Sequence, residues 1–220
     1  MIATEPKAYG TFIKKGNYIF RTSAYLQWGD SEKSVGACLL LNPGSAKLDD
    51  EISSVLEVKG FASGLIKCDP TMKQLISLVE KIYGKDVSGR LHIYNLFNLK
   101  YAQSENAVNL FENLVQTGQY NITDSLVSLE ELKTHPWILL GWGVKRESRW
   151  VNLELIKKQW KQLILESEIP SFGKKHPKRD DYDHPCPLIS TKRGVLLEEL
   201  VSIYKNQFDT YVLGNKSNLK

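Results

Sequence analysis

Three short, largely apolar runs divide the chain, and each one ends in polar or glycine residues. They occupy residues 35–41, 91–97 and 136–143 and read VGACLLL, LHIYNLF and PWILLGWG. Runs of this length and character are typical of strands buried on both faces of a sheet, with a loop at the carboxyl end. The pattern predicts an α/β protein in which helices cover a mostly parallel sheet.

Segments with helical spacing separate these runs. In residues 70–83 the apolar side chains fall at positions 72, 75, 76, 79 and 82, and Asp69 and Pro70 suit the cap and first turn of a helix. Further helices are expected over residues 105–116, 124–133, 148–166 and 194–204, and a weaker fourth strand over residues 169–175. We therefore expect a three-layer α/β/α sandwich with a central, mostly parallel four-stranded sheet.

The amino-terminal segment has a different pattern. Two β-rich runs flank Gly16-Asn17, a dipeptide suited to a tight turn. Residues 1–30 are expected to form a β-hairpin extension of a single domain that spans residues 1–220.

Composition restricts the class of protein. Hydrophobic residues make up 42% of the chain and charged residues 25%, which is typical of a globular protein with a buried core. The three cysteines form no CxxC pair, so neither a disulfide framework nor a metal site is indicated, and a cytoplasmic location is expected. No run approaches the roughly 18 apolar residues of a membrane span. The net charge of +4 permits an anionic partner without requiring one.

Polar residues at the ends of the predicted strands are candidates for a binding site, because ligands of α/β proteins bind at the carboxyl ends of strands. These residues are Asn42, Asn95, the region of Trp142 and the loop that contains His184. Pro43 and Gly44 would shape the loop after Asn42 and allow a ligand to approach the backbone. Two alternatives remain open: Asn42 may serve only as a turn residue, and Asn98 competes with Asn95 for either role.

The segment DHPCPLIS, residues 183–190, has the most distinctive local pattern. Pro185 and Pro187 restrict the backbone around His184 to an extended path. No carboxylates or histidines with metal-ligand spacing accompany His184, so no metal is assigned, and no positioned base suggests that Cys186 is a nucleophile. The basic residues 173–179 nearby could meet phosphates or could form a solvated charged loop.

Taken together, these motifs resemble two known families. The segments LLLNPGS (39–45), HIYNLFNLK (92–100), ILLGWG (138–143) and HPCPLIS (184–190) are similar, in this order, to strand-end motifs of the uracil-DNA glycosylase superfamily. The segments YIFRTSAYLQWG (18–29), LNPGSA (41–46), DPT (69–71), NLF (95–97), GWG (141–143) and HP (184–185) resemble the DUF1643 family over nearly the whole chain.

The glycosylase resemblance implies a base pocket and cleavage of an N-glycosidic bond in DNA or a nucleotide, with no cofactor. It implies that Asn42 holds the attacking water and that His184 contacts the leaving base. Asn95 would read the pyrimidine edge, and Leu188 would fill the gap left by an extruded base. Substrate contacts are also expected from Pro43, Gly44, Ser45, Phe97, Trp142 and Pro185, with Phe61 as a second stacking candidate beside Phe97.

Two rival hypotheses follow from departures from the family pattern. Asn42 provides an amide where an acidic group would activate water, which favours a nucleotide-binding module without turnover. Cys186 stands where the glycosylase motif has serine, which leaves open a cysteine-dependent hydrolase that uses Cys186 and His184.

Overall fold

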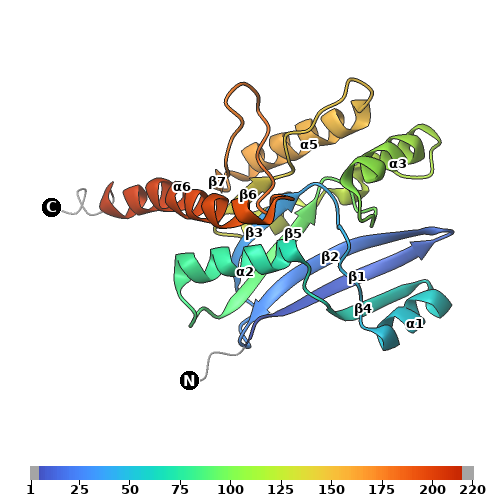
Figure 1. The fold of residues 1–220 in the computed structure, drawn as a ribbon, viewed down its shortest axis with the longest axis horizontal. Coiled ribbons are helices and arrows are strands. Elements are labelled where there is room, and N and C mark those ends of the chain that lie inside the picture. The colour runs from blue at the N-terminus through green and yellow to red at the C-terminus, as the bar shows by residue number, and fades with distance from the viewer. Residues whose placement is uncertain (1–4, 215–220) are drawn as a thin grey trace.

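A single seven-stranded mixed sheet forms the centre of the protein, and helices cover it (Figure 1). The computed structural model describes residues 5–214, so residues 1–4 and 215–220 of the predicted domain lie outside the described residues. The strands, in spatial order, are β4 (Phe61–Ile66), β1 (Lys7–Lys15), β2 (Tyr18–Trp28), β5 (Gly89–Asn95), β3 (Ser34–Leu40), β6 (Ile138–Gly141) and β7 (Ser171–Phe172).

The α/β class is confirmed, but the prediction of a four-stranded sheet is wrong. Neighbouring strands pair in parallel from β5 through β3 and β6 to β7, whereas β2 pairs with β5 in antiparallel orientation. The predicted hairpin of β1 and β2 forms around Gly16, and its β2 strand makes it continuous with the sheet. The edge strand β4 pairs with β1 and was not expected, because Ser63-Gly64 interrupts its apolar pattern.

Six α-helices connect and cover the strands of the described chain. They are α1 (Asp50–Lys59), α2 (Pro70–Tyr83), α3 (Ser104–Gln116), α4 (Leu129–Lys133), α5 (Val151–Ser167) and α6 (Arg193–Gly214). The helix expected over residues 124–133 is divided into a 3-10 turn, Ile122–Ser125, and the short α4. Asp69 caps α2 as predicted, since its Oδ1 accepts a hydrogen bond of 2.9 Å from the Met72 amide.

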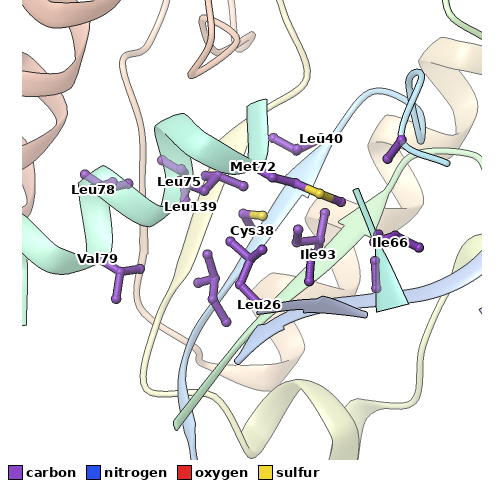
Figure 2. Packing of buried hydrophobic residues seen from close by; sticks show 14 of the residues in the cluster. Leu26, Cys38, Leu40, Ile66, Met72, Leu75, Leu78, Val79, Ile93 and Leu139 are labelled. Carbon is purple, nitrogen blue, oxygen red and sulfur yellow. The ribbon is translucent and has the colours of Figure 1, made fainter. Parts of the chain in front are cut away.

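Two hydrophobic clusters lie on opposite faces of the sheet. Alternate strand residues such as Cys38 and Ile93 pack beneath Met72 and Leu75 of α2, and α6 joins this cluster (Figure 2). Strand residues whose side chains point to the opposite face of the sheet, such as Leu39, pack against α3 and α5. The α2–α6 and α3–α5 pairs therefore enclose the parallel strands, which leaves the carboxyl ends of these strands as the place where loops can form a site.

Candidate functional site

A cavity of about 910 Å³ opens at the carboxyl ends of the parallel strands. Its walls are the loop that follows β3, the first turns of α2 and α3, the loop that follows β6, and the segment that leads into α6. A volume of this size suits a small organic ligand or a nucleotide. The position agrees with the general placement of ligands in open α/β sheets.

Most of the predicted site residues line this cavity. Those in contact with it are Asn42, Pro43, Gly44, Ser45, Trp142, His184 and Leu188. Three segments that are far apart in the sequence are thus brought together at one sheet edge. Leu188 is 99% exposed, so its apolar side chain projects from the protein beside the cavity mouth.

Three other predicted residues do not line the cavity. Phe97 is buried on the α3 face, where it stacks on Phe111 with ring centroids 4.5 Å apart. Pro185 is buried against the end of β6, where a Cβ atom at Gly141 would lie 2.6 Å from its ring. Asn95 is 3% exposed and lies behind the side chain of Arg21. The other stacking candidate, Phe61, is exposed on β4, away from the cavity lining.

The Asn42 side chain is held by the chain itself. Its Nδ2 donates a 2.8 Å hydrogen bond to the carbonyl oxygen of Tyr101, which ties the loop after β3 to the segment before α3. The amide oxygen of Asn42 is the atom that can orient a ligand or water. This contact gives Asn42 a structural role that joins distant segments, which differs from the local turn role that the sequence left open.

Trp142 forms part of the cavity wall and is fixed in place. Its indole Nε1 donates to Asp181 Oδ1 at 3.1 Å, and the Nζ of Lys161 lies 5.4 Å from its ring centroid. The side chain is 2% exposed. Trp142 therefore contributes an apolar surface to the cavity and no free donor.

His184 lies in a loop that fixes its ring. The Cys186 amide donates to Nδ1 at 3.2 Å, and the Cys186 carbonyl oxygen lies 3.1 Å from the same atom. Burial lowers the pKa of His184 below its ordinary value, although the Cys186 contact and Asp69 oppose this effect. His184 is therefore neutral at pH 7. The structure gives Nε2 no hydrogen-bond partner within residues 5–214.

Cys186 is a buried thiol whose pKa is raised by burial, with only partial compensation from Arg193. A thiolate is the reactive form of cysteine, so this environment disfavours nucleophilic chemistry. The cysteine-dependent hydrolase is accordingly the weakest of the three functional hypotheses.

Three residues that the sequence did not indicate as site residues also line the cavity: Arg21, Asp69 and Lys157. Asp69 uses Oδ1 to cap α2, and a Cβ atom at Gly44 would lie 3.5 Å from its Oδ2. Gly44 has a φ of 64°, which glycine adopts without strain. The carboxylate therefore lies close to the loop that carries Asn42. Arg21 lies in the segment YIFRTSAYLQWG and Asp69 in the segment DPT. Both segments belong to the DUF1643 resemblance, which was the signal that could have identified these residues.

Arg21 is an unusual cavity residue because its charge is buried. It is 4% exposed, and its Nη2 donates to Asn95 Oδ1 at 3.0 Å. Its Nε and Nη1, together with Asn95 Nδ2, are buried atoms that have no hydrogen-bond partner in the described part of the chain. Burial lowers the pKa of Arg21 to about 10, while Asp69 and Cys38 act in the opposite direction.

Lys157 is the other buried cation in the cavity lining, and it is fully paired. Its Nζ lies 2.9 Å from Asp181 Oδ1 and 3.0 Å from Glu154 Oε1. Burial alone would raise the pKa of Asp181, but the hydrogen bonds from Lys157 and Trp142 outweigh it and lower that pKa. This network joins α5 to the loop that precedes His184.

Neither a metal centre nor a membrane span is found in the part of the chain that the structure describes. No group of three histidine, cysteine or acidic side chains within residues 5–214 could hold a metal ion. Over the same residues, no helix combines the length and the apolar character needed to cross a bilayer.

Comparison of the chain with protein-family models, curated proteins and solved structures finds no match. The function proposed below is therefore argued from the residues and geometry of the cavity.

Proposed function

We propose that the cavity binds a nucleobase or nucleotide and that the protein hydrolyses the N-glycosidic bond of this ligand, with a fold of the uracil-DNA glycosylase type. The observation that carries this proposal is the convergence of Asn42, Trp142 and His184 on one cavity. Each comes from a different motif of the resemblance. Their convergence supports a shared ligand site, and the resemblance supports a nucleobase as its ligand.

His184 is the group that would contact the leaving base. The Cys186 amide donates to Nδ1 and the Cys186 carbonyl oxygen can accept from it, so these contacts fit either tautomer of the neutral ring; the proposed role uses the tautomer with its proton on Nε2. Nε2 can then donate a hydrogen bond to an oxygen of the base as negative charge develops there. A neutral donor suits this role because it needs no proton from solvent at pH 7.

In this proposal Asp69, a carboxylate of the cavity lining, acts on the sugar side of the bond. Glycosidic cleavage passes through a cation-like state of the sugar, which a nearby carboxylate stabilises, and a carboxylate can also activate water. The amide of Asn42 can orient water but cannot remove its proton. In this proposal Asp69 provides the carboxylate that is absent at position 42, and Asn42 orients the water.

The direct test is incubation of the protein with oligonucleotides that contain uracil, mismatched thymine or hypoxanthine, and with the corresponding free nucleosides and nucleotides. Release of the base and formation of an abasic sugar are expected. His184→Ala is expected to reduce the rate by about 10²-fold or more. His176→Ala, in a loop outside the cavity, is the matched control and should retain the rate. No base release together with no binding of any nucleoside would reject the proposal.

Binding without turnover is the second candidate. The hydrogen bond from Asn42 Nδ2 to Tyr101 favours it, because it gives Asn42 a structural role that needs no reaction. In this case nucleoside binding measured by calorimetry is expected without base release, and Asn42→Ala should leave the affinity largely intact. Measurable base release would reject this candidate and retain the first.

A further inference from the structure

Arg21 lines the cavity and Asn95 lies behind it; we call this pair the floor of the cavity, and both side chains carry unsatisfied hydrogen-bond donors. The Nε and Nη1 of Arg21 and the Nδ2 of Asn95 are buried and have no acceptor among residues 5–214. The one hydrogen bond that the guanidinium makes within residues 5–214, from Nη2 to Asn95 Oδ1, uses a single N–H of the five that it carries. Buried polar groups are nearly always satisfied in folded proteins, so a cluster of three unsatisfied donors calls for an acceptor.

The charge of Arg21 is also uncompensated. Asp69 attracts it, but no carboxylate of the described chain forms an ion pair with the guanidinium. Asp69 Oδ1 is occupied by the cap of α2. A buried cation is costly without a partner, and the cost is recovered when an anion reaches it.

Four charged side chains of the cavity lining, in contrast, form two ion pairs. Glu105 binds Lys145 at 2.5 Å, and Glu199 binds Lys174 at 2.7 Å. These four side chains line the cavity, so their charges largely cancel there. Of the two buried cations that line the cavity, Lys157 is paired with carboxylates and Arg21 has no carboxylate partner within residues 5–214.

Helix geometry strengthens the same preference. The first turns of α2 and α3 line the cavity through residues 70–72 and through Ser104 and Glu105. Amino-terminal turns carry unpaired amide N–H groups and a partial positive charge, which favour anions. In α2 the first turn contains no acidic residue of its own.

We propose that the floor formed by Arg21 and Asn95 binds a terminal oxyanion, the phosphate or carboxylate of a small ligand that enters the cavity. An oxyanion accepts several hydrogen bonds and donates none, and a guanidinium fork matches its geometry. The donor atoms are buried, so a ligand oxygen reaches them after a rotation of the Arg21 or Asn95 side chain.

The inference rests on the proposed function only in placing the ligand in this cavity, and it narrows the substrate class. The phosphates of a polynucleotide are diesters linked on both sides, and they follow the backbone outside a pocket that takes an extruded base. Because the floor is buried, a ligand can reach it only with a group at its end, such as a terminal phosphate or carboxylate. Free nucleotides, or carboxylate-bearing analogues, fit this requirement better than a base within a polymer.

Binding of inorganic phosphate and of acetate, each against chloride at equal ionic strength, tests the floor without any nucleobase. Saturable stabilisation in thermal melts and heat in calorimetric titration are expected for at least one of the two, and the stronger one identifies the oxyanion. The key variant is Asn95→Asp, which places a carboxylate against Arg21 and supplies the missing counter-charge. We expect it to raise Tm and to weaken oxyanion binding about tenfold or more.

Lys192→Met is the matched control, because Lys192 is an exposed cation at the mouth of the same cavity. It is expected to change the oxyanion affinity less than twofold. Arg21→Met provides a second floor variant, expected to abolish binding while its melt reports whether the protein is folded. Absence of phosphate and acetate binding, or equal loss in Lys192→Met and Asn95→Asp, would overturn the inference.

Uridine and uridine monophosphate separate this inference from the proposed function. If the nucleoside binds and the monophosphate binds no better, the floor inference fails and the base pocket remains. If phosphate binds at the floor and no nucleoside, nucleotide or base binds or is cleaved, the proposed function fails and the floor inference remains.

Discussion

Two buried cations line the same cavity and differ in their surroundings. Lys157 is 2% exposed and lies within 3.0 Å of two carboxylates, those of Asp181 and Glu154. Arg21 is 4% exposed and has one neutral partner, Asn95. Removing one member of a compensated buried pair strands a charge, whereas removing an uncompensated charge does not. Lys157 therefore stabilises the structure of the site, whereas the burial of Arg21 without a carboxylate partner supports the proposed role in binding an oxyanion.

Two histidines show the same contrast at opposite ends of the parallel strands. His135, before β6, has both ring nitrogens engaged, with Ser34 Oγ and Tyr94 Oη each 2.7 Å away. His184, beyond the carboxyl ends, uses Nδ1 within its own loop and leaves Nε2 without a partner in the described chain. The ring of His135 is therefore satisfied internally, whereas Nε2 of His184 is available to a ligand.

The largest expected effect is the loss of the compensated cation. Lys157→Met leaves Asp181 buried with an unpaired charge and should lower the free energy of unfolding by about 3–5 kcal/mol in urea denaturation. Lys161→Met is the control, because the Lys161–Asp180 pair of 2.9 Å is partly exposed and should contribute no more than about 1 kcal/mol. If the two variants lose equal free energy of unfolding, the burial of Lys157 with its two carboxylates makes no special contribution to stability.

A pH-dependent loss of similar size is expected from His135. Burial and the neighbouring His92 lower its pKa from 6.5 to about 4. The folded state resists protonation, so this contribution is present above pH 6.5 and is lost as the pH falls from about 6.5 to 4. The change is about 3 kcal/mol. Unfolding free energies measured across this range should fall, and His135→Gln should flatten the slope; an unchanged slope contradicts the assignment.

A smaller effect is expected where β6 meets the His184 loop. A Cβ atom at Gly141 would lie 2.6 Å from the ring of Pro185, so Gly141→Ala should cost about 1–3 kcal/mol and shift His184. Ligand affinity should fall with stability. In Gly194→Ala the new methyl group meets nothing within 4 Å, and both quantities should stay near their original values. Unaltered ligand binding in Gly141→Ala would show that the loop position does not matter.

The smallest expected effect is the removal of the uncompensated cation together with its partner. Arg21→Met combined with Asn95→Leu eliminates the unsatisfied donors and leaves no polar group stranded, so the unfolding free energy should stay within about 1 kcal/mol of the original protein or rise. Urea denaturation provides the measurement. A loss as large as that of Lys157→Met would show that Arg21 is a structural residue.

The parts of the fold that the sequence predicted were those with a local signature. The apolar run of residues 35–41 became a central strand, and Gly16-Asn17 became a hairpin turn. The pairing of β2 with β5 and the addition of β4 depend on contacts between distant segments, which local periodicity does not encode. The sheet was therefore underestimated by three strands.

The site was predicted where strand ends determine it. Asn42, Trp142 and His184 line one cavity because parallel strands end at one edge, and their functional roles stay a prediction. Asn95 was assigned to direct ligand contact, but the long side chain of Arg21 from the neighbouring strand lies in front of it. A charged residue in a hairpin strand is usually solvent-exposed, and only the three-dimensional packing shows that this one is buried.

A crystal structure of the protein soaked with a nucleoside monophosphate tests the central claim most directly. We predict a phosphate oxygen at hydrogen-bonding distance from Nε or Nη1 of Arg21, a second contact from Nδ2 of Asn95, and the base between Trp142 and His184. A phosphate held at the mouth by Lys192, with the Arg21 donors still unsatisfied, would contradict the account.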